Sequence, residues 1–118
     1  MDALGALRAA LGDAVDTSPA SLERARADES GHRAPGTPLA VVHARSVSDV
    51  QAVMRIASAT GTEVVPRGAG TGLAGGANTD AGQIALSLAH MNRIIEVRAE
   101  DLLAVVEPGI LNAQLNNA

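Results

Sequence analysis

A glycine-rich segment in the middle of the chain carries residue types that can bind phosphate. It runs Pro66-Arg67-Gly68-Ala69-Gly70-Thr71-Gly72-Leu73-Ala74-Gly75-Gly76. Glycine permits positive φ angles and close approach of the backbone, so successive amide N–H groups can point at one anion. Arg67 adds a guanidinium fork at the start of the loop, and Thr71 adds a hydroxyl. The segment indicates a phosphate-binding loop, and the alternative is a flexible connection between two strands.

Two common phosphate motifs do not fit this loop. P-loop NTPases need a lysine to reach the phosphates, and the chain contains none. The run from Gly70 to Gly75 does match the Gly-x-Gly-x-x-Gly of dinucleotide-binding folds, and Glu96 follows about twenty residues later. That motif must open a helix, however, whereas residues 75–82 are rich in turn formers. We therefore expect loop amides to hold the phosphate without a helix dipole behind them.

The histidines of the chain show no metal-ligand spacing. They are His32, His43 and His90. Each is interpreted as structural, although His32 lies in a loop near Asp28 where it could approach a ligand. The sequence offers no Ser/His/Asp arrangement either. We expect neither a metal site nor catalytic residues in this stretch.

Composition excludes several classes of protein. The net charge is −4 and the nine cationic residues are all arginines scattered along the chain, so nucleic acid and anionic lipid are not expected as main partners. There is no cysteine, which excludes disulfides, and no aromatic residue, so the core must be aliphatic. No segment resembles a signal peptide or reaches membrane-spanning length, and a cytoplasmic location is the expectation.

The first 37 residues are expected to form a helical arm and a loop. Leu4, Leu7, Leu11 and Val15 have helical spacing, and a second short helix is predicted from Ser21 to about Ala27. Residues 28–38 have no periodicity and contain two prolines, which predicts a loop. The main domain is expected to span residues 38–118.

A strand-helix-strand unit is predicted to lead into the glycine loop. Its strands are Leu39–His43 and Glu63–Pro66, and the helix between them ends at Gly61. The buried stripe of that helix is predicted to consist of Val47, Val50, Met54 and Ala57. Such crossovers are right-handed in nearly all proteins, so the loop should follow the carboxyl end of a parallel strand.

The remainder of the chain is predicted to complete a mixed sheet. Residues 83–88 read as a third strand, and residues 93–97 and 102–106 as a hairpin whose turn is solvated. The acidic residues of that hairpin are Glu96, Glu100 and Asp101. Pro108-Gly109 should end the last strand. A helix is predicted from Ile110 to Ala118, and we expect the chain to be the truncated N-terminal piece of a longer one.

Three segments together resemble the FAD-binding domain of vanillyl-alcohol oxidase type, also called PCMH-type. They are the glycine loop, the segment from Ile84 to Arg93 and the Val106-Glu107-Pro108-Gly109 turn. The similarity is greatest to the glycolate oxidase and D-lactate dehydrogenase branch and covers Leu39 to Ala118. It implies an α/β (α+β) fold, with a mixed sheet and flanking helices, that forms the first lobe of a FAD domain after the helical arm.

The resemblance also implies a cofactor and a function. By similarity, residues 67–72 should lie on the FAD diphosphate, residues 73–76 nearer the flavin, and Pro108 and Gly109 against the cofactor. The implied cofactor-binding residues are Pro66, Arg67, Gly68, Ala69, Gly70, Thr71, Gly72, Leu73, Gly75, Gly76, Pro108 and Gly109. The implied activity is flavin-dependent oxidation of a small 2-hydroxy acid by a longer chain whose substrate domain is absent here, with the electron acceptor left open. A non-catalytic nucleotide-binding module derived from such an enzyme is the alternative.

Overall fold

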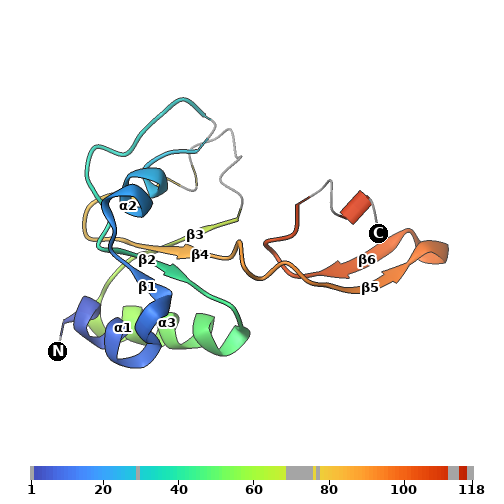
Figure 1. Cartoon of the computed structure of the whole chain (residues 1–118), viewed down its shortest axis with the longest axis horizontal. Coiled ribbons are helices and arrows are strands. Elements are labelled where there is room, and N and C mark those ends of the chain that lie inside the picture. Colours follow the sequence, from blue (N-terminus) through green and yellow to red (C-terminus); the bar gives the residue numbers. More distant parts are fainter. Residues whose placement is uncertain (1, 29, 69–75, 77, 112–114, 117–118) are drawn as a thin grey trace.

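The chain folds as an α/β domain whose elements follow the predicted order except for strand β1, which was not predicted (Figure 1). The computed structural model describes residues 2–28, 30–68, 76, 78–111 and 115–116. The helices are α1 (Ala3–Leu11), α2 (Pro19–Ala25) and α3 (Val47–Thr60), with 3₁₀ turns η1 (Gly12–Ala14) and η2 (Ala99–Asp101). The strands are β1 (Val15–Asp16), β2 (Ala40–His43), β3 (Val64–Arg67), β4 (Ile84–Ser87), β5 (Ile94–Arg98) and β6 (Leu103–Val106).

The main sheet has the strand order β1-β2-β4-β3. Strands β2 and β3 both run parallel to β4, which lies between them, so the predicted crossover through α3 is confirmed. The prediction of a mixed sheet is also confirmed, but its antiparallel strand is β1, which pairs with β2. The hairpin β5–β6 forms a separate two-stranded sheet. The carboxyl ends of three parallel strands therefore share one edge, and the glycine loop leaves β3 there.

Strand β1 replaces the end of the predicted first helix. Helix α1 stops at Leu11 because Gly12 takes a φ of 53° and donates its N–H to the Arg8 carbonyl. Val15, predicted to continue the helical stripe, pairs instead with Val42 in the sheet. The N-terminal segment is thus joined to the main sheet by backbone hydrogen bonds.

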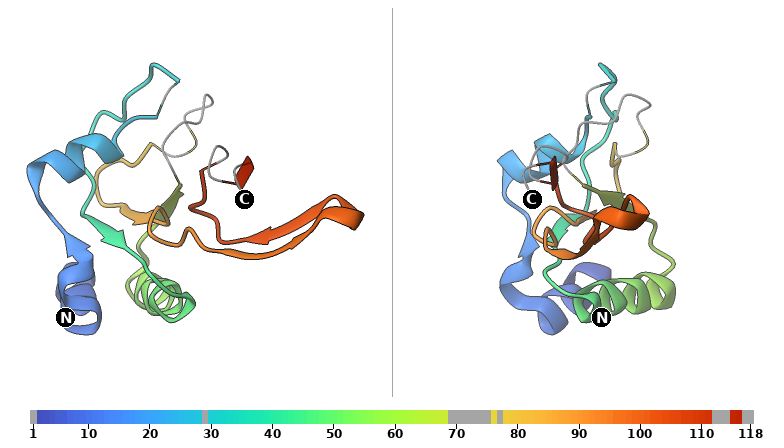
Figure 2. Two further views of the ribbon diagram at one scale, coloured as in Figure 1. Left: turned by 45° about the vertical axis from the view of Figure 1, so that its right-hand side comes forward. Right: turned by 90° about the vertical axis from the view of Figure 1, so that its right-hand side faces the viewer.

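The sheet is covered on both faces (Figure 2). Alternate residues of β2 and β4, namely Val42, Ile84 and Leu86, pack with Leu7 of α1 and Val53 of α3 in the main core. The residues between them face the other way. There Val41 and Ala85 pack against Ala25 and Leu22 of α2. Helix α2 therefore lies on the opposite face of the sheet from α1 and α3.

The buried stripe of α3 differs from the predicted one. The side chain of Ser46 caps the start of the helix by accepting the Asp49 N–H, and the left-handed Gly61, with φ 65°, ends the helix as expected. Val53 and Ala57 are buried, but Val47 and Met54 are 64% and 49% exposed. The helix carries more apolar residues than one face can bury. Val53 and Met54 lie three and four residues after Val50, and both spacings are compatible with the same helix face, so the sequence could not tell which of them is buried.

The hairpin β5–β6 projects from the rest of the domain (Figure 1). Its acidic residues Glu96, Glu100 and Asp101 are exposed as predicted. Its base is held by Glu107, which is 8% exposed and accepts bonds from the backbone N–H and guanidinium of Arg93 at 3.0 and 2.9 Å. Beyond it, Leu115 donates its N–H to Leu111 O at 3.1 Å, as in a helix. Much of the predicted last helix lies outside the described residues.

Candidate functional site

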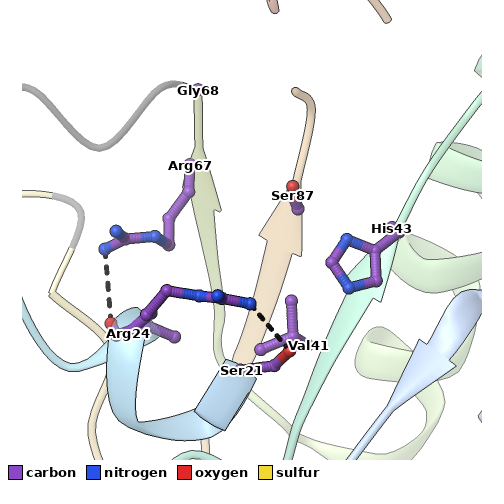
Figure 3. A pocket seen from close by; sticks show the side chains of 8 residues that line it. Ser21, Arg24, Val41, His43, Arg67, Gly68 and Ser87 are labelled. Atoms are coloured by element: carbon purple, nitrogen blue, oxygen red, sulfur yellow. Dashed lines mark hydrogen bonds between the residues drawn. The ribbon is translucent and has the colours of Figure 1, made fainter. Parts of the chain in front are cut away.

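Three polar side chains form a row at the carboxyl edge of the sheet. The strand register pairs Ser87 of β4 with His43 of β2 on one side and with Arg67 of β3 on the other. Residues directly opposite one another on paired strands point to the same face. The three side chains therefore lie together on the face covered by α2 (Figure 3).

A pocket of about 180 Å³ opens beside this row. Two apolar residues of its lining, Val41 and Ala25, belong to the cluster between the sheet and α2. The polar side chains and the loop residue that line it are Ser21, Arg24, His43, Arg67, Ser87 and Gly68. The pocket thus adjoins the first residue of the glycine loop after β3.

Arg67 joins β3 to the end of α2. Its guanidinium donates to Ala25 O at 3.3 Å and to Ala27 O at 3.0 Å. Partial burial lowers the pKa of Arg67, and the nearby charge of Asp28 opposes this shift. These bonds hold the guanidinium against backbone carbonyls on the α2 face. A role for Arg67 toward a cofactor phosphate stays a prediction.

Asp16 joins the N-terminal segment to the same row. Its Oδ2 accepts a hydrogen bond from Ser21 Oγ at 2.6 Å and lies 3.1 Å from His43 Nε2. Its Oδ1 accepts the Ser18 N–H at 2.9 Å. The hydrogen bonds from Ser21 and Ser18 hold the pKa of Asp16 far below its usual range. This network was not predicted, because it depends on the pairing of β1 with β2.

Replacing Asp16 by Asn is expected to make stability less dependent on pH under acid conditions. The pKa of Asp16 is lower in the folded than in the unfolded chain. Its contribution is therefore complete above its unfolded pKa, about 4, and is lost as the pH falls further. Urea unfolding at pH 7 and pH 3 should show a deficit of the variant at pH 7 that shrinks at pH 3. Asp13→Asn, an exposed change in η1, is the control, and equal deficits at both pH values would contradict the prediction.

The two segments predicted to contact the cofactor meet in the fold. Gly68 is exposed at the end of β3, and a Cβ added there would have only Pro108 O, at 3.7 Å, as a neighbour among the described residues. Its φ is not positive. Neither the backbone conformation nor the described neighbours require glycine at position 68. A contact between the Gly68 backbone and the FAD diphosphate stays a prediction.

Gly109 is glycine for a different reason. It is buried, and its N–H donates to Met91 O at 2.7 Å. A Cβ at this position would overlap Leu88 O and come within 2.9 Å of Met91 O. Packing against the Leu88–Met91 turn thus requires glycine here. The predicted cofactor contact of Gly109 stays a prediction.

The other predicted site residues lie at or beyond the edges of the described structure. Pro66 and Gly76 are exposed. Six more fall outside the described residues: Ala69, Gly70, Thr71, Gly72, Leu73 and Gly75. His43, interpreted from sequence as structural, lines the pocket, and its ring lies 5.5 Å from that of His90.

The described residues contain no group of three or more His, Cys, Asp or Glu side chains that could hold a metal ion. Among their helices, none has the length and apolar character needed to cross a bilayer.

Comparison with known proteins gives a consistent set of relatives. The chain is 39% identical over 101 residues to a D-2-hydroxyglutarate dehydrogenase of Stutzerimonas stutzeri, covering 86% of the chain and 22% of that protein. It is 35% identical over 115 residues to a probable mitochondrial D-lactate dehydrogenase of Danio rerio, covering 97% and 23%. It is 36% identical over 81 residues to glycolate oxidase subunit GlcD of Bacillus subtilis, covering 69% and 17%. The chain thus spans about a fifth of the length of these relatives.

Solved structures and the family assignment agree with these relatives. The fold matches p-cresol methylhydroxylase with a TM-score of 0.79 and 30% identity, over 98% of this chain and 23% of that one. It matches 4-ethylphenol oxidase of Gulosibacter chungangensis with a TM-score of 0.74 and 30% identity, over 92% and 22%. Residues 38–118 match the family described as FAD binding domain. The chain therefore belongs to this FAD-binding domain family, in which PCMH-type flavoproteins are its structural neighbours, and its cofactor is FAD.

Proposed function

We propose that this chain is the first lobe of the FAD domain in a flavin-dependent oxidoreductase that oxidises a small 2-hydroxy acid. The relatives named for D-2-hydroxyglutarate, D-lactate and glycolate support this substrate class. All three substrates carry a hydroxyl next to a carboxylate. The structural neighbours named for p-cresol and 4-ethylphenol support the fold and the flavin, but their phenolic substrates differ from this class.

The meeting of Gly68 with Pro108 carries the proposal. These residues are forty positions apart in sequence, and in the fold the Gly68 Cβ position lies 3.7 Å from Pro108 O. We propose that backbone N–H groups of residues 67–72 contact the diphosphate and that Pro108 and Gly109 contact the cofactor from the side of the hairpin. The parallel strand β3 sets the direction in which the loop leaves the sheet.

The protein's part in the reaction is to bind and orient the cofactor. When bound, FAD supplies an acceptor for the hydride equivalent leaving the carbinol carbon of the substrate. The residues of this chain fix the position of the dinucleotide through backbone donors that do not change protonation state.

Purification of the full-length natural protein tests the proposal. We expect it to be yellow and to release FAD on denaturation. Under anaerobic conditions, D-2-hydroxyglutarate, D-lactate or glycolate should bleach the flavin absorbance, whereas p-cresol should not. Flavin that no 2-hydroxy acid reduces would contradict the substrate class and favour a non-catalytic module. Bleaching by p-cresol alone would assign the protein to phenol oxidation.

A further inference from the structure

One backbone carbonyl at the end of α2 joins the two ends of the glycine loop. Before the loop, the Arg67 guanidinium donates to Ala25 O at 3.3 Å and to Ala27 O at 3.0 Å. After the loop, the Thr79 N–H donates to the same Ala25 O at 2.8 Å. A carbonyl oxygen has two lone pairs, so it can accept both bonds. The chain therefore enters and leaves the loop at one point on α2.

Further bonds hold the end of the loop to the residues that follow α2. Asn78 Nδ2 donates to His32 O at 3.1 Å. Farther along, Asp80 Oδ1 accepts the Gly36 N–H at 2.6 Å, and a Cβ added to Gly36 would overlap that oxygen. Three of the acceptors around the loop are backbone oxygens and form one group, the anchor carbonyls: Ala25 O, Ala27 O and His32 O.

The anchor carbonyls belong to a stretch of chain that is itself held in place. Ala25 is 2% exposed and packs against the sheet. Ala27 forms an isolated antiparallel bridge with Arg33. The Arg26 guanidinium donates to Ala34 O through Nε at 3.0 Å and through Nη2 at 2.8 Å. The anchor carbonyls thus give the ends of the loop a fixed reference on the α2 face of the sheet.

Fixed ends reduce the cost of binding a ligand to a glycine-rich segment. Glycine loses more conformational freedom on ordering than any other residue, and restraints that exist before binding lower that cost. We infer that Arg67 and Asn78 are positioning residues for FAD, whose side chains hold the loop ends on the anchor carbonyls. The backbone N–H groups proposed to contact the diphosphate then need less ordering when FAD binds. The inference rests on that proposed contact but not on the substrate class.

This role differs from the phosphate contact predicted for the Arg67 side chain. In the positioning role the shape of the guanidinium matters, because one group bridges two carbonyl oxygens. Lysine carries the same charge on a single ammonium, which cannot reproduce that fork. A direct role in neutralising the diphosphate would depend mainly on the charge. Arg67→Lys therefore separates the two roles.

FAD titration of the full-length apoprotein tests the inference, at a temperature at which circular dichroism shows every variant folded. We expect Asn78→Ala to weaken FAD binding at least threefold, because His32 O loses its donor from the end of the loop. Arg67→Gln and Arg67→Lys should both weaken it at least fivefold, since each loses a bridge of two bonds. Thr60→Ala is the matched control. It removes a hydroxyl that donates to Ile56 O at 2.8 Å, at the end of α3, and should leave FAD affinity unchanged.

Hydrogen exchange of the unaltered protein provides a measurement that needs no variant. If the anchors favour FAD binding, FAD must stabilise the anchors by the same factor. The Thr79 N–H, bonded to Ala25 O, should therefore exchange several-fold more slowly once FAD is bound. The Thr62 N–H, which donates to Ala57 O at 2.9 Å after α3, is the reference and should slow less.

Three results would overturn the inference. Unchanged FAD affinity in Asn78→Ala would show that the anchor after the loop does not serve the cofactor. Full affinity in Arg67→Lys but not in Arg67→Gln would assign that side chain a direct charge contact. Equal slowing of exchange at Thr79 and Thr62 would show that FAD does not act on the anchors. Gly70→Ala distinguishes these failures from failure of the proposed loop contact, because its FAD affinity should fall even if the anchor variants bind normally.

Discussion

Replacing Gly109 by Ala is expected to destabilise the protein by at least about 2 kcal/mol. The added Cβ would overlap the Leu88 carbonyl oxygen and stand 2.9 Å from both the Leu88 carbonyl carbon and Met91 O. These are backbone atoms, so no side-chain rotation can relieve the clash. Forcing extra atoms into a packed site typically costs about 1–3 kcal/mol, and the Gly109 N–H bond to Met91 O would be strained as well. Urea unfolding followed by far-ultraviolet circular dichroism measures the loss.

Gly76→Ala is the matched control for this effect. An added Cβ at Gly76 meets nothing within 4 Å among the described residues, and its φ is not positive. Without FAD, the control variant should therefore unfold at nearly the same urea concentration as the original protein. If Gly109→Ala also unfolds there, the hairpin base does not pack against the Leu88–Met91 turn as described.

Local patterns were sufficient to predict the strand-helix-strand unit. Short β-branched runs flanked the helix, Ser46 capped its start and Gly61 ended it, and each signal acts within a few residues. The handedness rule for crossovers then placed the glycine loop at the carboxyl end of β3. The family resemblance supplied the cofactor, which the match of residues 38–118 confirms.

Features that depend on tertiary pairing could not be predicted in this way. Strand β1 has only two residues, and Val15 also continued the helical spacing of Leu7 and Leu11. Without β1, the contact between Asp16 and His43 cannot be foreseen, and the polar pocket beside it stays hidden. The sequence does show that Asp16 precedes Ser18, the residue that caps α2, by two positions, so a local bond between them was foreseeable. Nothing in the sequence indicates that Asp16 also contacts His43 on β2.

The separation of the hairpin from the main sheet also needed the structure. Alternation of apolar residues predicts strands, but it does not say which sheet they join. Here β5 and β6 pair with each other in a separate two-stranded sheet. Their apolar residues Ile95 and Val97 are 61% and 52% exposed. The Glu107–Arg93 bonds close the base of the hairpin. The bond from Gly109 N–H to Met91 O, a residue of the main core, joins that base to the body.

Replacing Gly68 by Ala is expected to lower FAD affinity at least tenfold while leaving the FAD-free protein as stable as before. An added Cβ would meet only Pro108 O, at an ordinary 3.7 Å, and the φ of Gly68 is not positive. The substitution should thus cost the apoprotein no more than about 0.5 kcal/mol, and reduced freedom of the unfolded chain could offset even that. The same methyl group would occupy the space beside the proposed diphosphate position. A tenfold loss corresponds to about 1.4 kcal/mol.

The measurement pairs FAD titration of the apoprotein with its urea unfolding, for Gly68→Ala and Gly109→Ala together. Gly68→Ala should lose affinity without losing stability, whereas Gly109→Ala should lose stability first. Gly70→Ala and Gly72→Ala, which lie outside the described residues, are expected to lose FAD affinity at least tenfold as well. If Gly68→Ala binds FAD as tightly as the original protein, the cofactor does not approach this backbone. If its affinity and stability fall together, glycine at position 68 serves the fold, and the loop reverts to a flexible connection between two strands.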